Sequence, residues 1–425
     1  MRIVCAPKDH AFPAVGTGLG VVLYGAAGSR GRGSVGSALR QQIISERLVP
    51  DPRAWDFLSL ALSVVSADEA GHRSASPDGW TRDFDLEIAV GEPAFWTAHA
   101  EALERMLAFL TTDRWRLTFV EAQSEPARPR AIAMPDQDCI ALLSGGLDSL
   151  VGAIDVAASG ARPLAISQVV RGDAQKQVAF AQAIGGGLRH LQLNHNAVVP
   201  DPEKPPSQRA RSIAFLAYGV LAATTLARYS RGETVPLYIC ENGFIGINPP
   251  LTGARLGSLS TRTAHPTYLN QVQQLLESAG LRIRVENPFR FKTKGELMKG
   301  CADQALLNAH AHTSTSCGRY LRYNYKHCGR CIPCQVRRGA FLTWGVKDKT
   351  PYVFTKLGRK DAKHSYFDDV RAAALAIAEV EAEGLGRWLG TALSSAPLGE
   401  MPQLRAVVER GLGEIKALHF ALGVR

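Results

Sequence analysis

The pattern of apolar and polar positions divides the chain into parts with different periodicities. Within residues 1–135, strand candidates lie at 20–25, 83–90 and 115–121, and helical periodicity appears at 36–47, 52–66 and 94–110. The segment 83–90 alternates polar and apolar side chains, the period of a half-buried strand. This mixture predicts an N-terminal α+β domain.

A more regular pattern begins near residue 138. Short apolar runs alternate with helical segments, the runs at 139–143, 163–170, 188–193, 235–240 and 281–285 and the helices at 149–158, 174–184, 209–228 and 267–279. Such alternation predicts α/β architecture with a doubly wound parallel sheet covered on both faces. A polar, proline-containing stretch at 124–137 is typical of a linker, and residues 367–390 and 401–422 have helical periodicity. We therefore expect three domains: 1–135, 136–345 and a helical C-terminal extension, 346–425.

Composition and charge exclude some classes of protein and of partner. The 425 residues are 46% hydrophobic and 21% charged, which excludes a disordered or fibrous protein. The formal charge is +10, and residues 136–345 alone carry +10, whereas residues 1–135 carry −2. Residues 282–338 hold twelve basic and three acidic side chains. This distribution predicts a polyanionic substrate in the α/β segment and argues against nucleic acid as a partner.

The first residues, MRIVCAPKDH, lack the features of a secretory signal, and no window approaches about 18 unbroken apolar residues. Four of the eight cysteines lie between residues 317 and 334, which in an intracellular chain indicates metal binding. We expect a cytoplasmic protein with no membrane partner.

A loop after the first apolar run of the α/β segment has the composition of an anion-binding turn. Its residues are Ser144-Gly145-Gly146-Leu147-Asp148-Ser149. The glycines let the backbone approach an anion, and the N–H groups of the following helix point toward it. The hydroxyls of Ser144 and Ser149 can donate to phosphate oxygens, whereas the Asp148 carboxylate needs a bridging cation such as Mg²⁺.

This loop resembles the S-G-G-x-D-S signature of the PP-loop ATP pyrophosphatases. The resemblance implies that residues 144–149 bind ATP, that Asp148 and Ser149 take part in catalysis, and that a substrate oxygen is adenylated before a nucleophile displaces AMP. A simple strand-to-helix turn with a serine cap is the alternative. The chain has no Gly-Lys dipeptide, so a kinase-type phosphate loop is disfavoured. Residues 31–36 match G-x-G-x-x-G, but they do not follow their strand directly, and we interpret them as a flexible basic loop.

Four cysteines form the second motif. Cys317, Cys328, Cys331 and Cys334 have the spacing C-x10-C-x2-C-x2-C, with Gly329 and Pro333 favouring tight turns between the last three. Four thiolates suit a closed, structural tetrahedral Zn²⁺ site, and an iron–sulfur cluster is the competing interpretation.

Together the two motifs resemble the 7-cyano-7-deazaguanine synthase (QueC) family. The resemblance extends to Thr315-Ser316-Cys317, Gln335-Val336-Arg337-Arg338 and Arg211–Leu216, and covers about residues 138–342. It implies a PP-loop fold, ATP as cosubstrate and a 7-carboxy-7-deazaguanine-like small molecule whose carboxylate is adenylated and converted through an amide to a nitrile.

The chain departs from that family in length. Cys240-Glu241-Asn242-Gly243 and residues 260–266 are similar to longer QueC-like proteins of bacterial defence islands, and the layout is closest to the QueC-like component of the Qat anti-phage system. This similarity implies that the reaction stops at an amide formed on the N-terminal amine of a partner protein of the same system. A secondary amide has one N–H and cannot lose water to become a nitrile. We expect residues 1–135 and 346–425 to recruit that partner.

Six further residues are candidates for the site. Glu241 and Asn242 follow a strand end and can read the guanine-like edge of a base, or can belong to a capped loop. Arg262 and His265 face the phosphates or the acceptor, or else cap the helix that follows. Lys294 can neutralise departing pyrophosphate, with a solvated basic face as the alternative. Arg211 lies on an Ala/Leu-rich helix and can reach the nucleotide.

Our first hypothesis is therefore an ATP-dependent ligase that joins a deazaguanine carboxylate to an amine and releases AMP and pyrophosphate. The alternatives are a 7-cyano-7-deazaguanine synthase proper, a PP-loop tRNA-modifying enzyme, and a nucleotide-bound scaffold subunit of a defence complex.

Overall fold

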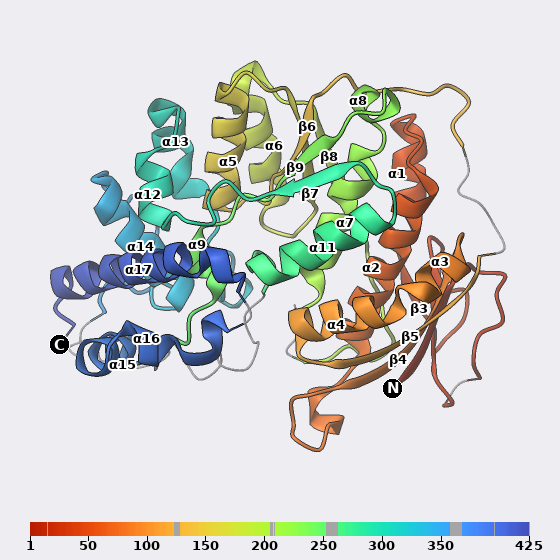
Figure 1. Ribbon diagram of the computed structural model, residues 1–425, viewed down its shortest axis with the longest axis horizontal. Helices are drawn as coiled ribbons and strands as arrows, with labels where there is room; N and C mark the ends of the chain where they lie inside the picture. Colours follow the sequence, from red (N-terminus) through yellow and green to blue (C-terminus); the bar gives the residue numbers. More distant parts are fainter. Residues whose placement is uncertain are drawn as a thin grey trace.

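Two parallel sheets and a group of C-terminal helices make up the molecule. The computed structural model describes residues 1–14, 16–122, 128–204, 207, 209–251, 262–357, 368–394 and 396–424. Within these ranges each sheet has five strands (Figure 1). We call the sheet of residues 2–121 the N-terminal sheet and the sheet of residues 139–286 the central sheet.

The N-terminal sheet has the order β3-β2-β1-β4-β5, and the strand pairs between neighbours are all parallel. Its strands are β1 (Arg2–Ala6), β2 (Leu19–Leu23), β3 (Gly33–Val35), β4 (Asp83–Val90) and β5 (Arg114–Glu121). We expected an α+β arrangement, but this unit is itself α/β. The sequence pattern looked irregular because β1, β2 and β3 are joined by segments whose described residues form no helix. Residues 33–35, expected within a flexible loop, form the short edge strand β3.

One face of the N-terminal sheet carries the helices of this unit. They are α1 (Leu39–Ser45), α2 (Pro52–Ala70), α3 (Pro93–Ala98) and α4 (Ala100–Thr111). The first six residues of β4 alternate between buried and more exposed positions, as the sequence predicted for a half-buried strand. Helix α2 is buried on nearly all sides, which means that it lies between layers instead of covering a surface.

The central sheet has the order β10-β9-β6-β7-β8 and is parallel throughout, as the alternating pattern predicted. Its strands are β6 (Cys139–Leu142), β7 (Pro163–Gln168), β8 (His190–Leu193), β9 (Val235–Tyr238) and β10 (Ile283–Glu286). The helices of this part are α5 (Leu147–Ala158), α6 (Ala174–Ala183), α7 (Arg211–Ala223), α8 (Ala227–Ser230), α9 (Gly243–Ile247), α11 (Pro266–Ser278), α12 (Lys294–Lys299), α13 (Gln304–His310) and α14 (Ile332–Trp344).

The two sheets share one hydrophobic core. Apolar residues of the N-terminal sheet, α2, α7 and one face of the central sheet belong to a single buried cluster, and α2 packs against α7 (Figure 1). A buried ionic network reinforces this junction. Arg82 donates to the carboxylates of Asp68 and Asp113, each at 2.6 Å, and Arg209, just before α7, donates to Asp113 at 3.1 Å.

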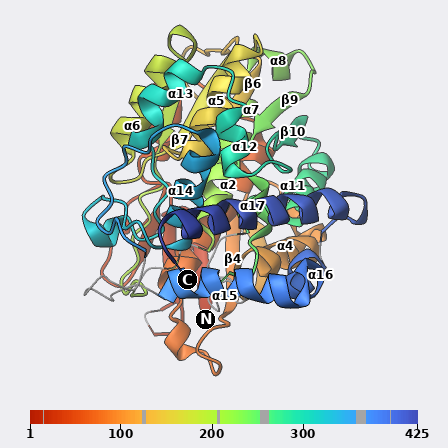
Figure 2. The same cartoon turned by 90° about the vertical axis from the view of Figure 1, so that its left-hand side faces the viewer.

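The C-terminal helices are α15 (Asp368–Glu383), α16 (Leu385–Leu389) and α17 (Met401–Ala421). They confirm the predicted helical extension. Helix α17 crosses in front of the central region with α15 beside it (Figure 2), and both join a buried cluster that also contains residues of α9 and α14. Within the described parts of the chain, no helix combines the length and apolar composition that crossing a bilayer requires.

Candidate functional site

The loop at residues 144–149 connects β6 to α5, at the carboxyl end of the central sheet. Gly145 has φ +77°, a conformation that favours glycine, and a Cβ at this position would lie 3.1 Å from the Cβ of Asp173. Hydrogen bonds between the two serines stabilise the turn. The backbone N–H of Ser144 donates to Ser149 Oγ at 3.1 Å, and the two hydroxyl oxygens lie 3.0 Å apart. The Ser149 hydroxyl donates to the carbonyl of Gly146 at 3.1 Å. Among the described residues, all hydrogen bonds of the two hydroxyls stay within the loop, so both hydroxyls can exchange these bonds for bonds to an anion.

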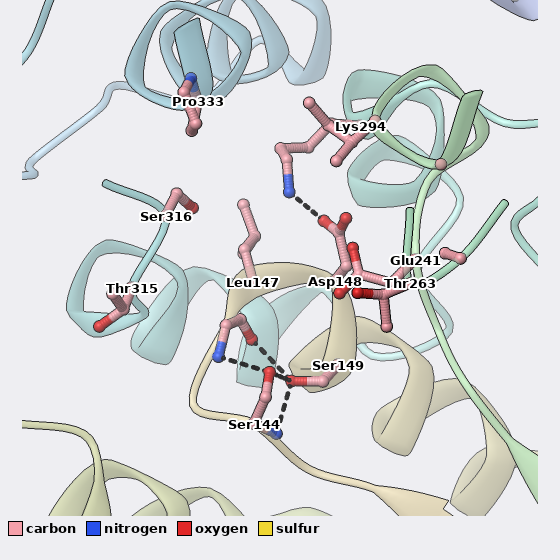
Figure 3. A pocket seen from close by; sticks show the side chains of 14 residues that line it. Ser144, Leu147, Asp148, Ser149, Glu241, Thr263, Lys294, Thr315, Ser316 and Pro333 are labelled. Atoms are coloured by element: carbon pink, nitrogen blue, oxygen red, sulfur yellow. Dashed lines mark hydrogen bonds and ion pairs between the residues drawn. The ribbon is translucent and has the colours of Figure 1, made fainter. Parts of the chain in front are cut away.

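Asp148, in the first turn of α5, is held by Lys294 and Asn242, and Figure 3 shows the contact with Lys294. The Lys294 ammonium forms an ion pair with Asp148 Oδ1. Asn242 donates to Oδ2 from its side-chain amide at 2.6 Å and from its backbone N–H at 3.2 Å. The amide oxygen of Asn242 also accepts from Ile245 N–H at 3.0 Å and so caps α9. Asn242 is fully buried, and its polar groups orient Asp148.

Glu241 contributes a second carboxylate beside Asp148. Burial, and then the negative charge of Asp148, raise the pKa of Glu241 from 4.5 to about 7, while the Lys294 ammonium acts in the opposite direction. Two carboxylates and one ammonium therefore share a confined space, an arrangement typical of functional sites.

These groups line a cavity of about 290 Å³. The described residues that line it are Ser144, Gly146, Leu147, Asp148, Ser149, Glu241, Ile245, Gly246, Thr263, Ala264, Lys294, Thr315, Ser316 and Pro333. The fold thus gathers candidates from both halves of the α/β segment around one polar space (Figure 3).

A second polar cluster lies on the other side of the loop. The backbone N–H of Thr315 donates to the carbonyl of Gly145 at 2.9 Å, and its hydroxyl donates to Asp173 at 2.6 Å. Lys176 donates to the Thr315 hydroxyl oxygen at 2.6 Å and to the hydroxyl of Tyr320 at 2.8 Å. Because Thr315 precedes Cys317 by two residues, this cluster connects the phosphate-type loop to the cysteine motif.

Five of the predicted nucleotide- and substrate-binding residues lie outside the described lining of the cavity: Gly145 and Asn242, whose contacts are given above, and Arg211, Arg262 and His265. His265 caps α11 by accepting from Thr267 N–H at 3.2 Å, and Arg262 donates to the carbonyl of Phe109 at 3.0 Å, so both contact or border α4 of the N-terminal unit. The placement of His265 agrees with the helix-capping alternative, whereas the Arg262 side chain contacts the last turn of α4 and not the helix that follows it. Arg211 begins α7 and interacts electrostatically with Asp173.

The four cysteines converge as their spacing predicted. Their Sγ atoms all lie within 4.8 Å of one another, with 3.8 Å between Cys317 and Cys331 and 3.9 Å between Cys328 and Cys334. A tetrahedral ion with metal–sulfur bonds of about 2.3 Å requires edges of about 3.8 Å. Backbone N–H groups of Cys328 and Cys331 donate to Cys317 Sγ at 3.3 Å and Cys328 Sγ at 3.2 Å, which favours thiolates. The group can hold a single metal ion.

The basic residues of 282–338 do not form the anion-binding wall that their number suggested. Lys294 alone among them appears in the described lining of the cavity. Arg337 is fully buried and donates to the carbonyl of Ala311 at 2.6 Å, and Arg338 donates to the carbonyl of Thr355 at 2.6 Å. These two arginines stabilise irregular backbone around the cysteines. Seven of the twelve basic residues in this stretch are instead exposed: Arg282, Arg284, Arg290, Lys292, Lys299, Arg322 and Lys326.

Sequence reasoning missed several residues of the site. Thr263, Thr315 and Ser316 line the cavity, although the sequence marked the last two only as neighbours of Cys317. Lys176 carried no sequence signal, because a lone lysine in a helical pattern is ordinarily solvated. The role of Asn242 in holding Asp148 depends on a contact between residues 94 positions apart.

Comparisons with known proteins point to one family. A sequence model of the family described as queuosine biosynthesis protein QueC matches residues 263–345. The chain is 26% identical over 238 residues to 7-cyano-7-deazaguanine synthase of Methanocaldococcus jannaschii, covering 50% of this chain and 98% of that protein. It is 26% identical over 244 residues to 7-cyano-7-deazaguanine synthase 1 of Sphingopyxis alaskensis, covering 52% of this chain and 100% of that protein. The similarity thus spans the relatives almost completely and about half of this chain.

Proposed function

We propose that this chain uses ATP to adenylate the carboxylate of a 7-deazaguanine and then transfers the acyl group to a nitrogen nucleophile. The observation that carries this proposal is the meeting of the S-G-G-x-D-S loop with Glu241 and Lys294 around one cavity. The relatives named 7-cyano-7-deazaguanine synthase supply the substrate class.

In the first step the substrate carboxylate oxygen attacks the α-phosphorus of ATP, and the bond to the bridging oxygen of pyrophosphate breaks. The backbone N–H groups at the start of α5 and the hydroxyls of Ser144 and Ser149 bind phosphate oxygens. Lys294 stabilises the negative charge that develops on pyrophosphate. In the second step an amine attacks the acyl carbon, AMP leaves, and the amine loses a proton.

A divalent cation fits the carboxylates present. Asp148 and Glu241 would hold Mg²⁺, which commonly uses one or two carboxylates together with substrate phosphates. When bound, the ion neutralises phosphate charge during displacement. Lys294 already pairs with Asp148, so a bound cation would share that carboxylate with the ammonium.

The four cysteines fit one tetrahedral Zn²⁺ better than an iron–sulfur cluster. A cluster binds its cysteines through several irons and so separates the sulfurs more widely than a single ion does. Here all four sulfurs lie within 4.8 Å, and the ion would have no open position. We therefore assign it a structural role.

The finer part of the proposal concerns the nitrogen nucleophile. We infer amide formation on the N-terminal amine of a partner protein in anti-phage defence, with a cytoplasmic location. The sequence similarity of residues 240–243 and 260–266 to longer defence-associated proteins supports it, although residues 252–261 lie outside the described residues. The extent of this chain beyond the part similar to the synthases also supports it.

The test is incubation of the purified protein with MgATP, 7-carboxy-7-deazaguanine and a nucleophile, which is either ammonia or a partner protein with a free N-terminal glycine. Release of AMP and pyrophosphate that requires the carboxylate is expected, and its absence would refute adenylation. A mass increase on a partner protein with a free N-terminal glycine supports the amide. A nitrile formed with ammonia alone would instead indicate a synthase.

A further inference from the structure

The C-terminal helix α17 reaches the element that carries Lys294. Glu414, in the middle of α17, is buried and accepts from Gly295 N–H at 3.3 Å. Its other oxygen accepts from the Thr293 hydroxyl. These two donors flank Lys294 in sequence, so one carboxylate of α17 holds the backbone on both sides of the lysine.

A second contact of α17 fixes the same turn. Arg410 donates to Glu296 at 2.5 Å and to the carbonyl of Phe291 at 2.8 Å. Glu296 in turn forms a capping box with Thr293, which starts α12. The start of α12 is therefore ordered by its own cap and by two side chains of a helix more than 100 residues later in the sequence.

The contact between Glu414 and the start of α12 is closely packed. A Cβ at Gly295 would overlap the Glu414 carboxylate and the side chain of Thr343 on α14. Glycine thus allows α12 to sit between α14 and α17, and the Lys294 side chain then extends from this turn to Asp148.

We propose that Glu414 is a positioning residue that aims the Lys294 ammonium into the cavity, so that α17 completes the site. This role rests on the proposed function, because Lys294 matters to catalysis only if pyrophosphate leaves there. It also changes the expected purpose of residues 346–425, for which the sequence suggested partner recruitment. Helix α17 contributes no residue to the described lining of the cavity, but it supports α12, which carries Lys294.

The charges that face this turn are consistent with such a role. Lys294 lies among the carboxylates of Asp148, Glu241 and Glu414, from α5, the segment after β9 and α17. Burial raises the pKa of Glu414, whereas its hydrogen bonds with Thr293 and Gly295 and the nearby Lys294 ammonium act in the opposite direction.

The experiment is a double-mutant cycle between Glu414→Ala and Lys294→Met, measured as carboxylate-dependent pyrophosphate release. Glu414→Ala is expected to lower kcat by about 10- to 100-fold while KM for ATP changes by less than about threefold, since misplacement of a catalytic group acts on the transition state. In the Lys294→Met background the same substitution should have no further effect. Glu414→Gln should recover most of kcat, because its amide oxygen still accepts from Gly295. Glu409→Ala, on an exposed position of α17, is the matched control.

Several results would overturn the proposed role. They are an unchanged kcat in Glu414→Ala, an equal loss of kcat in both backgrounds, and a Gln variant as impaired as the Ala variant. If the wild-type protein releases no pyrophosphate, the proposed function fails instead. The positioning role is then judged by hydrogen exchange at Gly295. That exchange should accelerate in Glu414→Ala but not in Glu409→Ala, and equal exchange in the two variants would reject the role.

Discussion

Replacing Glu241 by glutamine removes one of the two carboxylates that face each other in the cavity. The pKa of Glu241 is raised from 4.5 to about 7, chiefly by burial and then by Asp148. Between these values the folded protein binds more protons than the unfolded chain, so this group makes stability fall as pH rises through that window. One pH unit corresponds to about 1.4 kcal/mol, so the unfolding free energy falls by about 3 kcal/mol over the whole interval between the two pKa values. About 2 kcal/mol of this loss occurs above pH 5.5.

A glutamine amide can donate toward Asp148 as the protonated acid does. Glu241→Gln should therefore resemble the wild-type protein near pH 5.5 and exceed its unfolding free energy by up to about 2 kcal/mol at pH 8. Urea unfolding at several pH values, in buffer free of divalent cations but with the cysteine site loaded, measures the difference. Glu409→Gln, which alters an exposed carboxylate, is the control. Parallel stability curves for the wild type and Glu241→Gln would refute the coupling, and Mg²⁺ at pH 8 should stabilise the wild type more than Glu241→Gln.

Other contacts give three further predictions. Arg82→Met leaves the buried Asp68 carboxylate without its ion-pair partner and leaves Asp113 paired with Arg209 alone, and it should cost about 3–5 kcal/mol in urea unfolding. Arg105→Met, on the exposed side of α4, should cost less than about 1 kcal/mol. Thr315→Val keeps the hydrogen bond from its backbone N–H to the Gly145 carbonyl but loses the hydroxyl that contacts Lys176 and Asp173. It should weaken MgATP binding by about 5- to 10-fold in calorimetry, and unchanged affinity would contradict a link between the two clusters. Cys331→Ser should abolish stoichiometric zinc in elemental analysis and lower the melting temperature, and full zinc retention would remove the residue from the ligand set.

Much of the central sheet could be predicted because its signals are local. Each strand was a short apolar run followed by a helical period, and the loop at 144–149 matched a signature at every specified position. The four-cysteine site could also be predicted from the sequence, because three of the cysteines lie within seven residues. Such features need no knowledge of distant contacts.

The rest depended on long-range contacts that periodicity does not encode. Strand β1 is only five residues long and had no turn signal strong enough to mark it. Asn242 looked like a ligand for a base, yet its partner is Asp148 on another element. The basic count of residues 282–338 suggested a polyanion site, but most of these side chains lie outside the described cavity lining, and several instead bind backbone carbonyls. Glu414 was one glutamate in a long amphipathic pattern, and only the packing of α17 against α12 gives it a role.

The shared core of the two sheets has a consequence for how the chain is made. Helix α2 is synthesised with the N-terminal sheet, but α7, against which it packs, is completed about 100 residues after β5. At about 5–20 residues per second, the ribosome needs roughly 5 to 20 s to supply that partner. During this interval the apolar surface of α2 that later meets α7 stays uncovered on the nascent chain. Because exposed apolar surface promotes aggregation, we expect the N-terminal unit to be a chaperone substrate during synthesis until α7 covers α2.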